Sequence, residues 1–240
     1  MDWRPHGWVN LRSALARSSN VYFYTVGGGF ENVKGLGINR LKEYWQRFDL
    51  DKQTGIDLEG EGVGFLPDPD EKEKRTGQIW RIGDTYNVSI GQGDLAVTPI
   101  RLLVFFSSLA NSGKVLQPFL VKKIVNEKGE IIKENQPTEI FNYVDWQDEI
   151  KEVQKGLQDA VSKPYGTASL LYDLPYKTSA KTGSAQIANN TKTNAFFVGY
   201  GPSDHPQIAV LVLVEDAKEG SINTLPIAHD VLKWYYENRL

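Results

Sequence analysis

The stretch "NAFFVGYGPSDHPQIAVLVLVE", residues 194–215, decides the fold class of this 240-residue chain. It holds two apolar runs, 194–201 and 207–215, separated by the turn-forming segment Pro-Ser-Asp-His-Pro. Short runs rich in valine and phenylalanine favour β-strands, and a connection of five residues favours antiparallel neighbours. We therefore expect an antiparallel pair, extended to a sheet by a third strand at about residues 176–186.

Helical periodicity dominates most of the chain before these strands. Asn10 is a candidate cap of a first helix, which "RSSN" interrupts at residues 17–20. Apolar residues then recur at helical spacing in "GINRLKEYWQRFDL" (37–50), "VTPIRLLVFFSSLANSG" (97–113) and "DEIKEVQKGLQDAVSK" (148–163), and a last helix carries Ala228, Val231, Leu232 and Tyr235 on one face.

The order of these elements predicts an α+β fold, because the strands follow the helices rather than alternate with them. The helical part spans about residues 8–165, with a loop at 54–76 and a small hairpin near 115–134. The sheet and a C-terminal helix occupy about residues 174–240. A cleft between the helical part and the edge of the sheet is the expected place for a site.

Composition excludes several classes of protein. The chain has no cysteine, which excludes disulfides, thiol catalysis and Cys-ligated zinc. Its net charge is −3 with scattered basic residues, so nothing indicates a nucleic-acid partner. No apolar run reaches the length of a membrane span, and the first residues hold no signal-peptide core.

The segment "TSAKTGSAQ", residues 178–186, carries a candidate site on the first strand of the sheet. Lys181 can supply a cation for an anionic substrate, and Gly183 removes a side chain where a ligand must come close. The hydroxyls of Thr182 and Ser184 can hold a carboxylate. A solvated lysine on a surface strand explains a lone Lys-Thr-Gly equally well, and "KTS" at 177–179 is a decoy of the same kind.

A second candidate lies about 160 residues upstream, where Ser18 and Asn20 stand at the break in the first helical pattern. Serine and asparagine favour such junctions because they bond the local backbone, so a helix cap explains them when taken alone. Ser-x-Asn followed far downstream by Lys-Thr-Gly, however, is the pairing found in penicillin-binding proteins and their β-lactamase relatives.

The chain resembles the transpeptidase domain of class B penicillin-binding proteins, most of all the elongation-type group known as penicillin-binding protein 2. The resemblance rests on an ordered set of segments: "ALARSSNVYFY", "TGIDLEGEGVGFLP", "NVSIGQGDLAVTPIRL", "LANSGKVLQPFLV", "YGTAS", "AKTGSAQ", "NAFFVGYGP" and "LPIAHDVLKWYYE". It implies the penicillin-binding transpeptidase and serine β-lactamase fold. Three departures are Ser184 in place of threonine, Arg101 in place of glutamine, and "NAFF" in place of His-Ala-Trp-Phe.

The resemblance also implies a nucleophile that we do not find. In this family it is the serine of a Ser-x-x-Lys motif upstream of Ser-x-Asn, and no serine of this chain has a lysine three positions later. We therefore interpret residues 1–240 as a partial transpeptidase domain, truncated at its N-terminus and inactive alone.

The family's roles carry over to matching positions. Ser18 is expected to relay a proton, Asn20 to bond the substrate backbone and Lys181 to supply positive potential. Thr182 and Ser184 are expected to hold the substrate's carboxylate, and the N–H of Ser184 to form half of an oxyanion hole.

For the whole protein, the resemblance implies a peptidoglycan D,D-transpeptidase at the periplasmic face of the bacterial inner membrane. Its expected partners are peptidoglycan stem peptides or lipid-linked precursors, β-lactams and the cell-wall elongation machinery. No metal and no organic cofactor is implied.

Two alternatives stay open from the residues. The chain could be a non-catalytic module that binds peptidoglycan or a partner through the same cleft. It could also be an unrelated serine hydrolase, because "NVSIG" around Ser89 resembles a nucleophile elbow whose first glycine is Asn87. The "GQG" at 91–93 lacks the surroundings of a nucleotide loop.

Overall fold

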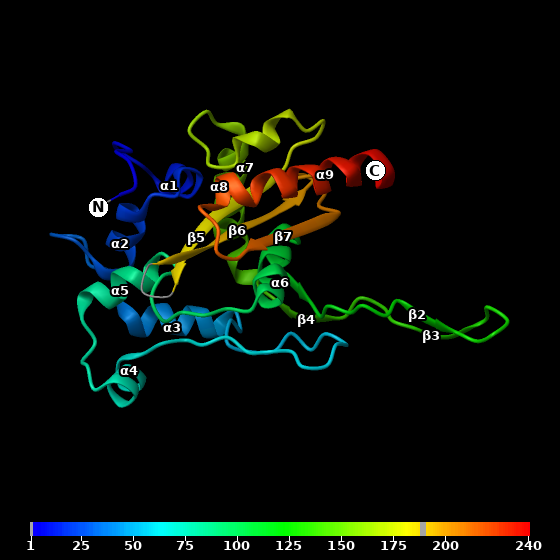
Figure 1. The fold of residues 1–240 in the computed structure, drawn as a ribbon, viewed down its shortest axis with the longest axis horizontal. Helices are drawn as coiled ribbons and strands as arrows, with labels where there is room; N and C mark the ends of the chain where they lie inside the picture. The colour runs from blue at the N-terminus through cyan, green and yellow to red at the C-terminus, as the bar shows by residue number, and fades with distance from the viewer. Residues whose placement is uncertain (1, 188–190) are drawn as a thin grey trace.

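The computed structural model describes residues 2–187 and 191–240. The chain forms helices first, then a small sheet, and ends in a helix that lies along the sheet (Figure 1). The expected α+β order is confirmed.

The helical part begins where the sequence predicts. Asn10 caps the first helix, its side chain accepting a hydrogen bond from the N–H of Ser13 at 3.0 Å. Apart from α4 (Pro69–Thr76), the α-helices of this part are α1 (Leu11–Arg17), α2 (Asn20–Gly28), α3 (Gly37–Arg47), α5 (Ile82–Ser89), α6 (Pro99–Ala110) and α7 (Gln147–Ser162). Thr98 caps α6 and Pro99 opens it, because proline at the first helical position lacks only an N–H that would be unpaired there.

The three expected strands form one antiparallel sheet in the order β5 (Ser179–Ile187), β6 (Lys192–Gly201) and β7 (Ile208–Val214). Lys181 lies opposite Val198 on β6, and Val198 lies opposite Leu211 on β7. β5 begins at Ser179 rather than near residue 176.

Helices cover both faces of this sheet, which explains why its strands read as nearly continuous apolar runs. On one face, Phe197 packs with Ala228 and Leu232 of α9 (Leu225–Arg239). On the other, Val198 and Tyr200 pack with α6 and α7. The predicted apolar face of the last helix is right at Ala228 and Leu232, whereas Val231 is 40% exposed.

The predicted loop at 54–76 is wrong in its last third, where residues form helix α4 (Pro69–Thr76). Asp68 caps this helix by accepting from the N–H of Glu71 at 2.8 Å, and Arg75 pairs with Glu71 one turn earlier. The high density of charge in this segment favours a loop, but its acidic first turn and basic last turn stabilise a helix through the helix dipole.

The small hairpin predicted near 115–134 is formed by β2 (Lys123–Val125) and β3 (Ile131–Glu134) and projects from the body (Figure 1). Its turn lies at Gly129, whose φ is +81°. The residues at 114–116 instead form β1 (Lys114–Leu116), which pairs with β4 (Glu139–Asn142). Short helical segments η1 (Val144–Trp146), η2 (Ser169–Asp173) and α8 (Gly220–Asn223) complete the described elements.

Candidate active site

Lys181 and Ser18 meet between the sheet and the helical part, although 163 residues separate them. β5 positions Lys181, whose Nζ donates to Ser18 Oγ at 2.8 Å and to the carbonyl of Thr182 at 2.5 Å. Burial lowers the pKa of Lys181 to about 8. The site therefore holds a cation whose charge is easily lost, next to a hydroxyl.

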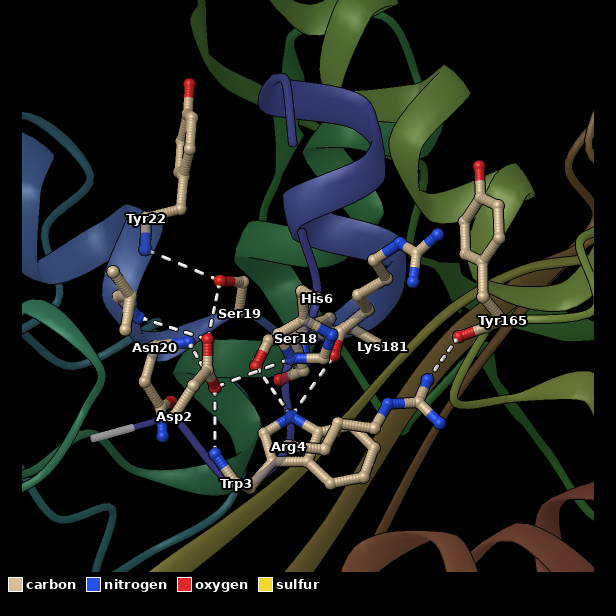
Figure 2. Close-up of polar contacts among 12 residues, drawn as sticks. Asp2, Trp3, Arg4, His6, Ser18, Ser19, Asn20, Tyr22, Tyr165 and Lys181 are labelled. Atoms are coloured by element: carbon tan, nitrogen blue, oxygen red, sulfur yellow. Dashed lines mark hydrogen bonds and ion pairs between the residues drawn. The ribbon is translucent and has the colours of Figure 1, made fainter. Parts of the chain in front are cut away.

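Ser18 owes its place to a sharp break between α1 and α2. Its backbone is left-handed, with φ 54° and ψ 48°, a conformation uncommon for residues other than glycine. Ser19 then caps α2 by accepting from the N–H of Tyr22 at 3.4 Å. The cap explanation is thus correct for the middle residue of Ser-x-Asn, while Ser18 turns toward Lys181 (Figure 2).

Two residues near the chain start hold this break, and our sequence reasoning missed both. The carboxylate of Asp2 accepts from Ser19 Oγ at 2.7 Å and from the N–H of Asn20 at 3.2 Å (Figure 2). The indole N–H of Trp3 lies 3.2 Å from the carbonyl of Ser18 and 3.3 Å from that of Arg17. Aspartate is a common capping residue, but Asp2 is far from α2 in the sequence. The sequence therefore does not reveal that Asp2 caps this helix.

The carboxylate of Asp2 is held in its charged form. Burial raises its pKa, but the hydrogen bonds from Ser19, Asn20 and neighbouring N–H groups outweigh burial, so the pKa of Asp2 lies below its ordinary value. Asn20 begins α2 with its backbone fixed by this contact.

The two hydroxyls predicted on β5 differ in access. Thr182 is 7% exposed and its Oγ1 bonds Thr167 Oγ1 at 2.8 Å. Ser184 is exposed, and its Oγ accepts from the N–H of Gly220 at 3.1 Å. Thr167 belongs to the segment "YGTAS", whose sequence alone does not indicate this contact with β5.

Gly183 is not explained by packing within the protein. A Cβ added there would meet only Phe196 Cβ, at 3.5 Å, an ordinary van der Waals contact. Side chains alternate along a strand, so Gly183 faces the same side of β5 as Lys181. The surface beside Lys181 is therefore open.

The decoy and the hydrolase alternative do not join this site. Lys177 is exposed, whereas Ser89 lies at the end of α5 with its Oγ donating to the carbonyl of Thr85 at 2.6 Å. Among the described residues, His229 of α9 pairs with Asp173 and with its neighbour Asp230, and not with Ser89. Ser89 is therefore bonded within its own helix rather than presented on a strand-to-helix elbow.

Residues 2–233 match the family model described as the penicillin binding protein transpeptidase domain. The chain belongs to this family. The match covers both halves of the site, Ser18 with Asn20 and Lys181 with its neighbours, and confirms the resemblance drawn from the ordered segments.

Curated relatives are peptidoglycan D,D-transpeptidases named MrdA. That of Haemophilus influenzae is 30% identical over 262 residues, which cover 100% of this chain and 38% of the relative. That of Escherichia coli K12 is 32% identical over 244 residues, covering 93% of this chain and 37% of the relative. The chain thus spans well under half the length of these relatives.

Solved structures agree with the fold. Penicillin-binding protein 2 of Pseudomonas aeruginosa, in complex with WCK 5153, is 32% identical with a TM-score of 0.81, over 99% of this chain and 52% of that one. Penicillin-binding protein 2 of Helicobacter pylori, in a complex with MreC, is 27% identical with a TM-score of 0.81, over 100% of this chain and 42% of that one.

Proposed function

We propose that this chain supplies the substrate cleft of a peptidoglycan D,D-transpeptidase that joins stem peptides by acyl transfer. The observation that carries the proposal is the contact of 2.8 Å between Lys181 Nζ and Ser18 Oγ. It joins the two motifs of the family into one site, with a cation, hydroxyls and a strand edge that has no strand partner among the described residues. The whole-protein activity is taken from relatives that this chain covers only in part.

The reaction needs a serine nucleophile from a Ser-x-x-Lys segment, which the 240 residues do not contain. Its oxygen attacks the carbonyl carbon of the penultimate D-alanine, and the peptide C–N bond breaks. The leaving D-alanine takes up a proton, and an amine of a second stem peptide then displaces the serine and forms the new peptide bond. Each step passes through an oxyanion, which N–H donors stabilise.

The residues of this chain serve that reaction by binding and by moving protons. We propose that Lys181 supplies the positive potential that attracts the substrate's terminal carboxylate. Ser18 Oγ, bonded to Lys181 Nζ, is placed to pass a proton to the leaving amine. Asn20 binds the substrate backbone, and the N–H of Ser184 contributes half of the oxyanion hole.

Carboxylate binding falls more to Ser184 than to Thr182. The hydroxyl of Thr182 is buried and already bonded to Thr167, whereas that of Ser184 is exposed. Gly183 leaves room beside Lys181 for the ligand. We propose that Thr182 helps chiefly by fixing β5.

For the whole protein we propose a location at the periplasmic face of the inner membrane. We also propose that β-lactams inhibit it and that the cell-wall elongation machinery is its partner. The complex of a Helicobacter pylori relative with MreC supports the last point. No helix among residues 2–187 and 191–240 is long and apolar enough to cross a membrane.

The test is acylation by a labelled penicillin, in a chain extended upstream to include a Ser-x-x-Lys segment. Lys181→Ala should slow acylation by about two to three orders of magnitude, as expected when one electrostatic contact to developing charge is lost. Lys177→Ala, on the exposed decoy, is the matched control and should change the rate little. Equal losses from both substitutions would contradict the assignment of the motif.

A further inference from the structure

Gln92 forms an unusual pair of hydrogen bonds with the strand that carries Lys181. Its Nε2 donates to the carbonyl of Ser184 at 2.9 Å, and its Oε1 accepts from the N–H of Gln186 at 3.1 Å. Gly91 and Gly93 flank it with φ of +75° and +76°, so the bend depends on two left-handed glycines. This is the "GQG" segment that no nucleotide-binding role explained.

The contact lies on the edge of β5 that faces away from β6. Within the described residues the sheet has the order β5-β6-β7, so β5 has one edge without a strand partner. Backbone groups alternate along a strand, so residues 182, 184 and 186 direct their N–H and C=O groups to this outer edge. The amide of Gln92 therefore stands where the peptide group of a further strand would lie.

Little of the outer edge then remains free. Lys181 Nζ already bonds the carbonyl of Thr182, and Gln92 holds the carbonyl of Ser184 together with the N–H of Gln186. The N–H of Ser184 is the last outward-facing donor before the contact with Gln92. A peptide antiparallel to β5, with its carboxylate at Lys181, would direct its N-terminal residues toward Gln92.

We propose that Gln92 is a specificity-determining residue that ends strand pairing between β5 and an extended peptide. The proposal rests on the proposed function, because it requires a peptide on this edge. A short donor pairs as far as Ser184 and never meets Gln92. A longer peptide gains further pairing along β5 only by displacing both hydrogen bonds of Gln92, which makes the site insensitive to the distant part of the peptide.

The first experiment tests the contact without any ligand. Amide hydrogen exchange of the 240-residue chain should show protection at Gln186 that Gln92→Ala removes by at least about fivefold, the equivalent of one net hydrogen bond. Gln92→Glu keeps an oxygen that can accept from the N–H of Gln186, so it should retain more protection than Gln92→Ala, although it loses the bond to the carbonyl of Ser184. Gln78→Ala, at an exposed glutamine after α4, is the control and should leave Gln186 protected. Unchanged exchange in Gln92→Ala would overturn the proposal.

The second experiment measures binding by calorimetry, for acetyl-D-alanyl-D-alanine and for a five-residue peptide with the same C-terminal end. Gln92→Ala should leave the affinity of the short ligand within about twofold and raise that of the long one about five- to tenfold, because two hydrogen bonds no longer need to be displaced. Equal changes for both ligands would overturn this proposal alone. Absence of binding by both, with Gln186 still protected, would overturn the proposed function as well.

Discussion

At the scale of single residues, the site depends on a lysine that the fold keeps partly out of water. Lys181 Nζ has a hydroxyl and a carbonyl as partners in the structure. Neither can stabilise its charge as a carboxylate would, so burial decides the direction of its pKa shift. An anionic ligand would supply the missing charge, which links occupancy of the site to the protonation of Lys181.

This link predicts a pH dependence of ligand binding. The pKa of Lys181 is lowered from 10.5 to about 8, so the free site loses its charge above pH 8. Affinity for acetyl-D-alanyl-D-alanine should be constant from pH 6 to 8 and then fall by up to about tenfold per pH unit. Calorimetry across pH 6–10 measures this. Lys181→Arg stays charged throughout and should show no such fall; the same fall in that variant would contradict the assignment.

The same shift affects stability with the opposite sign. Between the folded pKa of about 8 and the ordinary value of 10.5, the unfolded chain binds the proton that the folded chain releases. Stability therefore rises with pH in this window. Ligand affinity should therefore fall above pH 8 while the free energy of unfolding rises. A denaturation curve at each pH tests this, because a loss of binding caused by unfolding would instead come with a lower free energy of unfolding.

Gly183 gives a second prediction at this scale. An added Cβ meets only Phe196 Cβ at 3.5 Å, so Gly183→Ala should shift the melting temperature by no more than a few degrees. If the open space beside Lys181 receives the ligand, the same substitution should weaken binding by roughly tenfold or more. Thermal melts and calorimetry test the two parts, and a variant that loses stability while binding normally would contradict the interpretation.

Much of the residue-level site was predictable because its motifs are local in sequence. Ser-x-Asn and Lys-Thr-Gly are each short motifs typical of the family, and their pairing predicted that Ser18 and Lys181 belong to one site; the structure adds the direct contact between them. The contacts of Asp2, Thr167 and Gln92 were not predictable in this way. Each side chain is ordinary in its own segment, and its partner is set by tertiary packing.

At the scale of elements, helix starts decide where functional side chains lie. α2 has two caps. Ser19 directly precedes the helix, and Asp2 lies 18 residues before Asn20 in the sequence. An aspartate cap also begins α4, where Asp68 accepts from the N–H of Glu71. The cap of α1 was predicted because apolar periodicity follows Asn10, whereas α4 was not predicted because it has no buried residue and so no apolar face.

The cap on α2 predicts a coupling between stability and the site. Asp2→Ala should lower the free energy of unfolding by about 1–2 kcal/mol, the usual value of a helix cap. It should also loosen the turn that carries Ser18, so exchange at Asn20 and Val21 should rise. Asp2→Asn keeps an acceptor oxygen and should lose less. Since the pKa of Asp2 is lowered by its contacts, the stabilisation should be present at neutral pH and disappear as pH falls below its ordinary value of 3.8. An equal loss in both variants would indicate packing rather than capping.

At the scale of the whole molecule, the fold brings the family's Ser-x-Asn and Lys-Thr-Gly motifs together, and the 240 residues contain no Ser-x-x-Lys. Both faces of the sheet are buried, and α7 packs against the strand that carries Lys181. The sequence predicted this arrangement because strands, turn and final helix are each strongly patterned. It predicted the hairpin of β2 and β3 but not the pairing of β1 with β4, because strands of three and four residues carry too little periodicity to reveal a partner.

The absence of Ser-x-x-Lys from the 240 residues predicts the behaviour of this chain alone. In a related enzyme class, loss of the serine costs on the order of 10⁶ in turnover, because the remaining groups can only bind and polarise. Here the lysine that activates the serine and the serine's half of the oxyanion hole would be missing as well. We expect no covalent adduct with penicillin after long incubation, by intact-protein mass spectrometry, while a chain extended to include the motif should gain the mass of one acyl group. If any serine of this chain reacted, Ser18 would be the first candidate, because it contacts a lysine whose pKa is lowered. A stoichiometric adduct mapped to Ser18 in the unextended chain would show that it is a nucleophile rather than a proton relay.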